Sequence, residues 1–135
     1  MVRDGKGKEY KYLNGKRNGK GKEYNYWNGE LIFEGEYING KRWNGKGKEY
    51  SDYDGKLIFE GEYLKGERNG KGKEYNYWNG KLEFEGEYFN GERNGKGKEY
   101  YNDGKIKFEG EFFNGQSNEN CKIYWNHVYF FFNYI

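Results

Sequence analysis

One motif recurs along this chain with a nearly fixed period, and it constrains the fold more than any other feature. The hexapeptide Gly-Lys-Gly-Lys-Glu-Tyr begins at Gly5, Gly19, Gly45, Gly70 and Gly95, so its copies lie 14, 26, 25 and 25 residues apart. Because a fixed period means that one small unit is stacked repeatedly, the structure of the unit decides the structure of the whole chain. The short first interval predicts that the array opens with an incomplete unit.

Each unit contains a segment in which apolar residues and glutamates alternate, such as Phe-Glu-Gly-Glu-Tyr at residues 59–63. A period of two is the pattern of a half-buried β-strand, in which successive side chains point to opposite faces. A helix is excluded because Ala is absent and because each Gly in a helix interior would cost about 1 kcal/mol. We therefore predict strands with Phe, Gly and Tyr on one face and Glu on the other.

Two turn signals divide each unit, because an Asn-Gly or Asp-Gly pair favours a tight turn between antiparallel strands. The pairs that we assign to these turns begin at Asn28, Asn39, Asp54, Asn79, Asn90, Asp103 and Asn114. The chain is therefore predicted to be all-β, an elongated and twisted single antiparallel sheet built from tandem β-hairpins. We place the repeat array, of about four units, at residues 1–115 and a degenerate, aromatic-rich capping segment at residues 116–135.

The Gly-Lys-Gly-Lys segment is predicted to form the second strand of each hairpin. Its lysines lie on the face opposite its glycines, so they can meet the glutamates of a neighbouring strand at about 0.2–1 kcal/mol per pair. Its glycines would leave gaps on the other face, where aromatic rings can lie. By strict alternation Tyr50 falls on the lysine face, unless a bulge shifts it.

The charge balance excludes some classes of partner. The chain has 24 Lys and Arg against 22 Asp and Glu, a net charge of +2, whereas nucleic-acid-binding proteins usually carry a strongly basic surface. Its one cysteine, Cys121, is compatible with a reducing compartment. The N-terminus lacks the apolar core of a secretory signal, and no apolar run approaches the ~20 residues of a membrane span. We expect a cytoplasmic protein without a nucleic-acid partner, and we leave open a peripheral contact with a membrane.

The residues that enzymes use are scarce in this sequence. His127 is the one histidine, so neither a nucleophile–base pair nor a Cys/His metal cluster can be assembled. Residues 40–46 match the start of a phosphate-binding loop, but Gly47 stands where Ser or Thr must hold the metal. The recurring glutamates Glu34 and Glu36 are explained by a solvated charge ladder. We predict no catalytic residue, no cofactor, no metal and no small-molecule substrate.

The pattern Tyr/Phe-Glu-Gly-Glu-Tyr-x-Asn-Gly-Lys-Arg-Asn-Gly-Lys-Gly, over about residues 5–115, resembles the MORN (membrane occupation and recognition nexus) repeat. The longer unit with Asn-Gly-Lys-Leu-x-Phe is also similar to a variant found in bacterial proteins described as antitoxins. The resemblance implies a sheet of hairpins that serves as a scaffold, a dimerisation element or a membrane-proximal module. The catalytic domain that accompanies the array in larger relatives has no counterpart in this sequence.

Three functions follow as hypotheses, and the first is a non-catalytic scaffold that binds a protein partner or a second copy through its aromatic face. The predicted partner-binding residues are Leu31, Phe33, Tyr37, Leu57, Phe59, Tyr63, Leu82, Phe84, Tyr88, Phe108 and Phe112.

The second hypothesis is peripheral binding to anionic phospholipid membranes through a basic turn rim, at about 1 kcal/mol per basic residue near the surface. That rim consists of Arg17, Lys41, Arg42, Arg68 and Arg93. The third hypothesis, an antitoxin-like inhibitor of a partner protein, rests on the resemblance alone, and a toxin gene beside this one would favour it.

Overall fold

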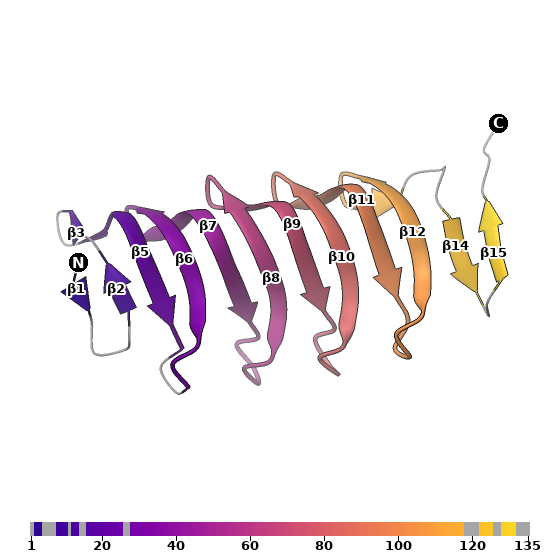
Figure 1. Cartoon of the computed structure of the whole chain (residues 1–135), viewed down its shortest axis with the longest axis horizontal. Helices are drawn as coiled ribbons and strands as arrows, with labels where there is room; N and C mark the ends of the chain where they lie inside the picture. Colours follow the sequence, from indigo (N-terminus) through magenta and orange to yellow (C-terminus); the bar gives the residue numbers. More distant parts are fainter. Residues whose placement is uncertain are drawn as a thin grey trace.

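The computed structural model describes the backbone of residues 2–3, 8–10, 12–13, 16–25, 28–117, 122–125 and 128–131, with side chains at 16–25 and 28–117. All regular structure in these residues is β-strand, as the alternation predicted. Thirteen strands form one antiparallel sheet, whose strands lie side by side along the long axis (Figure 1), and β3 pairs with β4 separately. The predicted all-β fold of tandem hairpins is confirmed.

The strands are β1 (Val2–Arg3), β2 (Lys8–Tyr10), β3 (Tyr12–Leu13), β4 (Lys16–Arg17), β5 (Gly19–Tyr24), β6 (Leu31–Ile38), β7 (Lys41–Tyr50), β8 (Leu57–Leu64), β9 (Glu67–Tyr75), β10 (Leu82–Phe89), β11 (Glu92–Tyr100), β12 (Ile106–Phe113), β13 (Gln116–Ser117), β14 (Lys122–Trp125) and β15 (Val128–Phe131). The sheet order is β1-β2-β5-β6-β7-β8-β9-β10-β11-β12-β14-β15, and β13 also pairs with β12. From β5 to β12 each strand therefore pairs with the next one in sequence.

The tight turns have the backbone that the Asn-Gly signal predicted. Asn39 and Gly40 have φ values of 51° and 83°, and Asn90 and Gly91 have 49° and 86°. Positive φ at both central residues defines the type I′ turn, whose twist matches that of the flanking strands. The turn between β8 and β9 has the same backbone at Lys65, although Lys-Gly is a weaker turn signal than Asn-Gly.

The core consists of aromatic rings that lie on glycines. Phe59 is fully buried, and a Cβ added to Gly72 would stand 2.8 Å from the Cε2 atom of Phe59 and 2.9 Å from that of Tyr88. Edge-to-face ring contacts then run along the sheet, with centroids 5.4 Å apart for Phe59 and Tyr88 and 5.7 Å for Phe84 and Tyr88. The predicted role of the glycines as gaps for rings is confirmed for the second glycine of the hexapeptide.

The first glycine of the hexapeptide has a different role. Gly70 has a φ of 86°, a left-handed backbone that favours glycine. It lies in a bulge of β9. Gly61 pairs with Gly72 and Tyr63 pairs with Arg68, so an advance of two residues along β8 is matched by four residues along β9. The expectation that both glycines of the hexapeptide leave gaps for rings is corrected here, because the first glycine is required by its left-handed backbone conformation.

The extra residue of the first full unit, Trp43, changes the pairing of its hairpin. In that hairpin Gly35 pairs with Gly45, the first glycine of the hexapeptide, whereas Gly61 pairs with Gly72, the second. The insertion lies in β7 and leaves the Phe-Glu-Gly-Glu-Tyr strand intact, as predicted. Its consequence is a two-residue shift of β6 relative to β7.

Beyond the regular array, β14 pairs with β12 and β15 pairs with β14. The backbone thus continues the sheet by a further hairpin, while the capping role of residues 116–135 stays a prediction. Cys121 and His127 lie outside the described residues. The part of the chain that the structure describes holds no helix long and apolar enough to cross a membrane.

Replacing Gly72 with Ala is expected to lower the free energy of unfolding by about 1–3 kcal/mol, because the new methyl group overlaps two rings. Chemical denaturation measures this, with Lys73→Ala, an exposed neighbour, expected within about 0.5 kcal/mol of wild type. In a Phe59→Leu background the extra cost of Gly72→Ala should shrink. An equal cost in both backgrounds would contradict packing of the ring on the glycine.

Candidate interaction surface

The structure places the predicted aromatic face in the core. Phe33, Tyr37, Phe59, Phe84, Tyr88, Phe108 and Phe112 are each 0–5% exposed, and Tyr63 is half-buried against them. Side chains with so little exposed surface cannot form a contact area for a partner in this conformation. The prediction that these rings form an open binding face is therefore wrong, and the rings are the core that holds the hairpins together.

The leucines assigned to the same face lie apart from these rings. Leu82 pairs with Tyr75 while Phe84 pairs with Glu74, so one residue of β10 bulges between them. Such a bulge breaks the strict alternation on which the assignment of Leu31, Leu57 and Leu82 depended. None of the three belongs to the described core clusters, and this part of the prediction is corrected.

The arginines assigned to the basic rim are largely turned into the array. Arg68 is half-buried and its Cζ atom lies 3.9 Å from the centroid of the Phe59 ring. The matching distances are 4.0 Å for Arg93 over Phe84 and 4.9 Å for Arg42 over Phe33, within the range of cation–π contacts.

The prediction that the basic rim binds lipid headgroups is therefore corrected. Arg17 lies 3.9 Å from Glu23, and Arg42 is bonded to the same carboxylate at 2.8 Å. Arg68 and Arg93 are likewise paired with glutamates, so four of the five predicted rim residues have acidic neighbours. Lys41 remains exposed at the turn edge.

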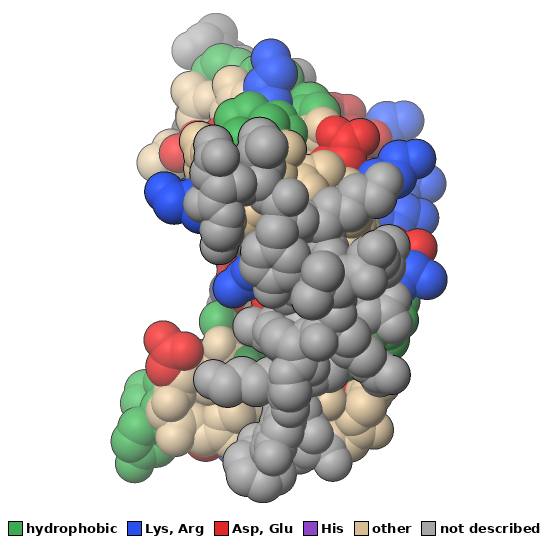
Figure 2. All heavy atoms as spheres, turned by 90° about the vertical axis from the view of Figure 1, so that its left-hand side faces the viewer, with side chains coloured by type: hydrophobic (Ala, Val, Ile, Leu, Met, Phe, Trp, Pro, Cys, Tyr) green, Lys and Arg blue, Asp and Glu red, His purple; other side chains and the backbone are tan. Residues whose placement is uncertain are grey.

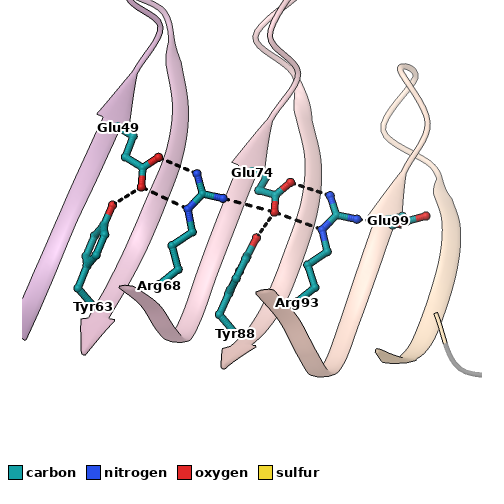
Figure 3. A network of polar contacts seen from close by, with 7 residues as sticks. All are labelled: Glu49, Tyr63, Arg68, Glu74, Tyr88, Arg93 and Glu99. Carbon is teal, nitrogen blue, oxygen red and sulfur yellow. Dashed lines mark hydrogen bonds and ion pairs between the residues drawn. The ribbon is translucent and has the colours of Figure 1, made fainter. Parts of the chain in front are cut away.

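Arg42, Arg68 and Arg93 each close what we call a clasp, an Arg–Glu–Tyr group that joins two repeats. Arg68 donates to both oxygens of Glu49, at 2.6 Å from Nη2 and 3.2 Å from Nε, and the Tyr63 hydroxyl donates to the same carboxylate at 2.6 Å. Glu49 belongs to β7, whereas Tyr63 and Arg68 belong to β8 and β9. Figure 3 shows this group and its copy in the next repeat.

The clasps are connected to one another. Arg93 donates to Glu74 at 2.7 Å and to Glu99 at 2.8 Å, and Tyr88 donates to Glu74 as well. Arg68 lies 3.8 Å from Glu74, which links its clasp to the next one. A row of alternating carboxylates and guanidinium groups therefore runs across the strands above the ring core (Figure 3).

The clasps shift the ionisation of their carboxylates. Burial alone would raise the pKa of the Glu74 carboxyl, but hydrogen bonds from Arg93 and Tyr88 outweigh it and hold the pKa below its ordinary value. The pKa of Glu49 is lowered in the same way, against burial, by hydrogen bonds from Arg68 and Tyr63. The charged form of each carboxylate is thus part of the fold.

The sequence contained a signal for this network that the prediction missed. Glu49 has the same strand parity as Gly47, so alternation places its carboxylate on the ring side. A carboxylate among aromatic rings needs a hydrogen-bonded cationic partner. Arg68 and Tyr63 recur at fixed offsets from it in the next repeat, as Arg93 and Tyr88 do from Glu74, and they supply that partner.

The face opposite the rings, which we call the charged face, bears two rows of alternating Lys and Glu. Row 1 consists of Lys46, Glu62, Lys71, Glu87, Lys96 and Glu111. Strand pairing matches Lys46 with Glu62, Lys71 with Glu87 and Lys96 with Glu111, and at the bulges the backbone N–H groups of Lys71 and Lys96 donate to Glu62 and Glu87. From β7 to β12 the strand pairing gives row 2 as Lys48, Glu60, Lys73, Glu85, Lys98 and Glu109. In Figure 2, a view along the sheet, the outline is hollowed on one side, and many of the visible basic side chains lie on the other.

Two tyrosines that follow a Lys-Glu pair, Tyr75 and Tyr100, also lie on the charged face, as strict alternation predicted. The Tyr75 hydroxyl donates to Glu60 at 2.6 Å, and the Tyr100 hydroxyl donates to Glu85. Burial and the bond to Glu85 raise the pKa of Tyr100 to about 12.

A groove of about 1270 Å³ runs between the two rows. Its floor is the main chain of the glycines on β7 to β12, Gly47, Gly61, Gly72, Gly86, Gly97 and Gly110. At the β6 end Ile32 and Phe33 line it, because the shift caused by Trp43 pairs Phe33 with Gly47. The groove is thus an open site with main chain below and charged side chains on both walls.

A third exposed feature is an apolar row at the turn edge, one residue per hairpin. Its members are Ile38, Leu64, Phe89 and Phe113, and their exposure rises from 41% at Ile38 to 67% at Phe113. Each stands immediately before a tight turn, so the row follows the edge of the sheet.

The described residues contain no group of three His, Cys, Asp or Glu that could hold a metal ion. The five matches of the MORN repeat family model span residues 11–29, 33–55, 59–81, 84–106 and 108–126. The chain belongs to the MORN repeat family. MORN repeats form a non-catalytic family and commonly serve in molecular interaction or membrane binding. No curated protein matches the chain.

Replacing Glu74 with Gln is expected to lower the free energy of unfolding of this MORN repeat protein at pH 7 by about 1–3 kcal/mol, because the hydrogen bonds from Arg93 and Tyr88 lose their charged acceptor. Because the folded pKa of Glu74 lies below the ordinary 4.5, its contribution is present above pH 4.5 and is lost as the pH falls through the folded pKa. The variant should therefore show a weaker loss of stability between about pH 5 and pH 3 than the wild type.

The matched control for this prediction is Glu83→Gln, the same change at an exposed position of the next strand. It should leave both the stability and its pH dependence within about 0.5 kcal/mol of wild type. If both variants followed the wild-type acid profile, Glu74 would not be a clasp carboxylate.

Proposed function

We propose that this MORN repeat protein is a non-catalytic scaffold that binds a protein partner on its charged face. The observation that carries the proposal is the groove of about 1270 Å³ between the two Lys/Glu rows. The aromatic rings are buried, so the charged face is a regular surface that remains for recognition among the described residues. A cytoplasmic location stays a prediction.

The pattern of charge favours a protein partner over a polyanion. From β7 to β12 the two rows contain six lysines and six glutamates, so this stretch has no net charge. A nucleic acid requires a basic surface that displaces counterions, and this face supplies an acidic strand beside every basic one. A protein surface can present both signs and match them position by position.

The rigidity of the array supports the same function. Ring contacts and clasps join each hairpin to the next, which fixes the spacing of the rows. Binding of a partner that matches this spacing therefore costs little free energy for ordering the scaffold.

The proposal predicts that a double variant, Lys73→Glu with Lys98→Glu, captures about tenfold less of its partner from an extract of the source cells than the wild type does. Quantitative mass spectrometry of the captured proteins measures this. The control, Lys41→Glu with Lys65→Glu, makes the same charge change at the exposed turn edge, away from the groove, and should capture wild-type amounts. Equal capture by all three proteins would refute binding in the groove.

A second candidate, peripheral membrane binding, is supported by the apolar row at the turn edge rather than by the arginine rim. Exposed apolar side chains in one line along an edge can enter the boundary between headgroups and acyl chains. Phe89 and Phe113 are the most exposed members of the row. Lys41 and Lys65 lie beside it and would face anionic headgroups.

This second candidate predicts that the wild type floats with anionic liposomes at low salt and that Phe89→Ser with Phe113→Ser reduces the floating fraction about threefold or more. Both side chains are exposed, so the fold should survive the change. Trp78→Ser, an exposed aromatic change at the opposite loop edge, is the control and should leave flotation unchanged. Absence of wild-type flotation at low salt would remove the membrane function.

A further inference from the structure

We infer that the charged face is complementary to itself and that its occupant is a second copy of this chain, bound antiparallel. The inference rests on the proposed function, since it names the partner of the same groove. It follows from the order of charges along the two rows and from the number of strands that bear them.

The charge on this face alternates once per strand. β7, β9 and β11 each present two lysines, and β8, β10 and β12 each present two glutamates. Neighbouring strands lie about 4.8 Å apart, so the pattern repeats every ~10 Å along the groove. The same pattern is present on every copy of the chain.

A two-fold axis that is parallel to the strands and passes between β9 and β10 brings each strand opposite one of the other sign. It places β9 against β10 of the second copy, β8 against β11 and β7 against β12. The resulting pairs in row 1 are Lys71–Glu87, Glu62–Lys96 and Lys46–Glu111. Those in row 2 are Lys73–Glu85, Glu60–Lys98 and Lys48–Glu109. In a two-fold interface each pair occurs twice.

Other arrangements and other occupants match the pattern less well. A two-fold axis along the groove would place every strand against its own copy, so lysines would meet lysines. An extended peptide laid along the groove would present side chains on one face every ~6.7 Å, which does not match a period of ~10 Å. The second copy has the correct period because its strands have the same spacing.

Most of the lysines needed for this contact are accessible. Lys46, Lys71, Lys73 and Lys96 are exposed. Of the other two lysines in the rows, Lys48 is paired with Glu30 and Lys98 lies 3.9 Å from Glu109. Four of six lysines therefore extend toward solvent, where a facing glutamate can meet them.

The size and chemistry of the contact set its strength. Six strands span about 29 Å, which places the interface at the small end of specific protein contacts. Partly exposed ion pairs are screened by salt. We therefore expect a dimer that dissociates on dilution and whose Kd rises about tenfold or more between roughly 50 mM and 500 mM NaCl in sedimentation velocity.

Zero-length carbodiimide cross-linking of the whole chain tests the orientation. Lys48 on β7 and Glu109 on β12 are five strand spacings apart in one chain, about 24 Å, so a direct amide between them can form only between copies. The account predicts the Lys48–Glu109 and Lys46–Glu111 cross-links at low salt and their loss at about 500 mM NaCl. If the neighbouring pair Lys98–Glu109 is cross-linked while both long-range pairs are absent, the inference is overturned.

Charge reversal supplies a second test. Lys73→Glu places two carboxylates opposite each other at the two-fold axis, and Glu85→Lys places two ammonium groups there, so each variant alone should dimerise about tenfold more weakly. An equimolar mixture should recover heterodimer to within about threefold of the wild-type Kd, since the carboxylate introduced in one variant then faces the ammonium group introduced in the other. Circular dichroism before mixing confirms that both variants are folded. Two folded variants whose mixture stays monomeric would overturn the inference.

The two proposals fail in different ways. A chain that is monomeric at low salt up to about 500 µM, a concentration at which even a weak interface of this size associates, would overturn the second-copy occupant. If Lys73→Glu with Lys98→Glu still reduces the amount of another protein that this chain captures, the scaffold function stands. A salt-sensitive dimer with the predicted cross-links supports the inference whether or not another protein is captured.

Discussion

In three described hairpins an arginine lies over a phenylalanine ring and pairs with a carboxylate of the preceding repeat, and the rest of the array depends on this contact. Arg93 is 4.0 Å from the Phe84 ring and donates to both Glu74 and Glu99. The ring in turn needs a glycine beneath it, because any Cβ at Gly97 would stand 2.7 Å from the ring. A single-layer sheet has no second layer to cover its rings, so ring, glycine and clasp together replace the usual core.

Much of this fold could be predicted because the deciding interactions are local. Alternation defined the strands, Asn-Gly defined the type I′ turns, and the rings do lie on glycines. The reach of Arg68 could not be read from its place beside a turn, since a long side chain in the turn region can point either to solvent or across the rings. The position of Leu82 depends on a one-residue bulge that the period of two conceals. The register of β6 depends on one inserted residue, Trp43, whose effect is set by pairing rather than by local preference.

These differences move the functional question from one face of the sheet to the other. Once the rings and arginines are assigned to the interior, the described surface that remains regular is the pair of Lys/Glu rows with main chain between them. The same inward turn of Arg68 and Arg93 removes the basic rim as a membrane contact and leaves the apolar edge in its place. A repeated unit thus gives a repeated surface, and a partner that binds this surface must present charges with the same spacing.

The clasp is the central claim, and a double-mutant cycle between Glu74 and Arg93 tests it most directly. The free energies of unfolding of the wild type, Glu74→Gln, Arg93→Met and the double variant would be measured by chemical denaturation at pH 7. The account predicts a coupling energy of about 1–3 kcal/mol, because the two side chains stabilise each other across the hairpin boundary. Additivity within about 0.3 kcal/mol would contradict it, since the two residues would then act independently.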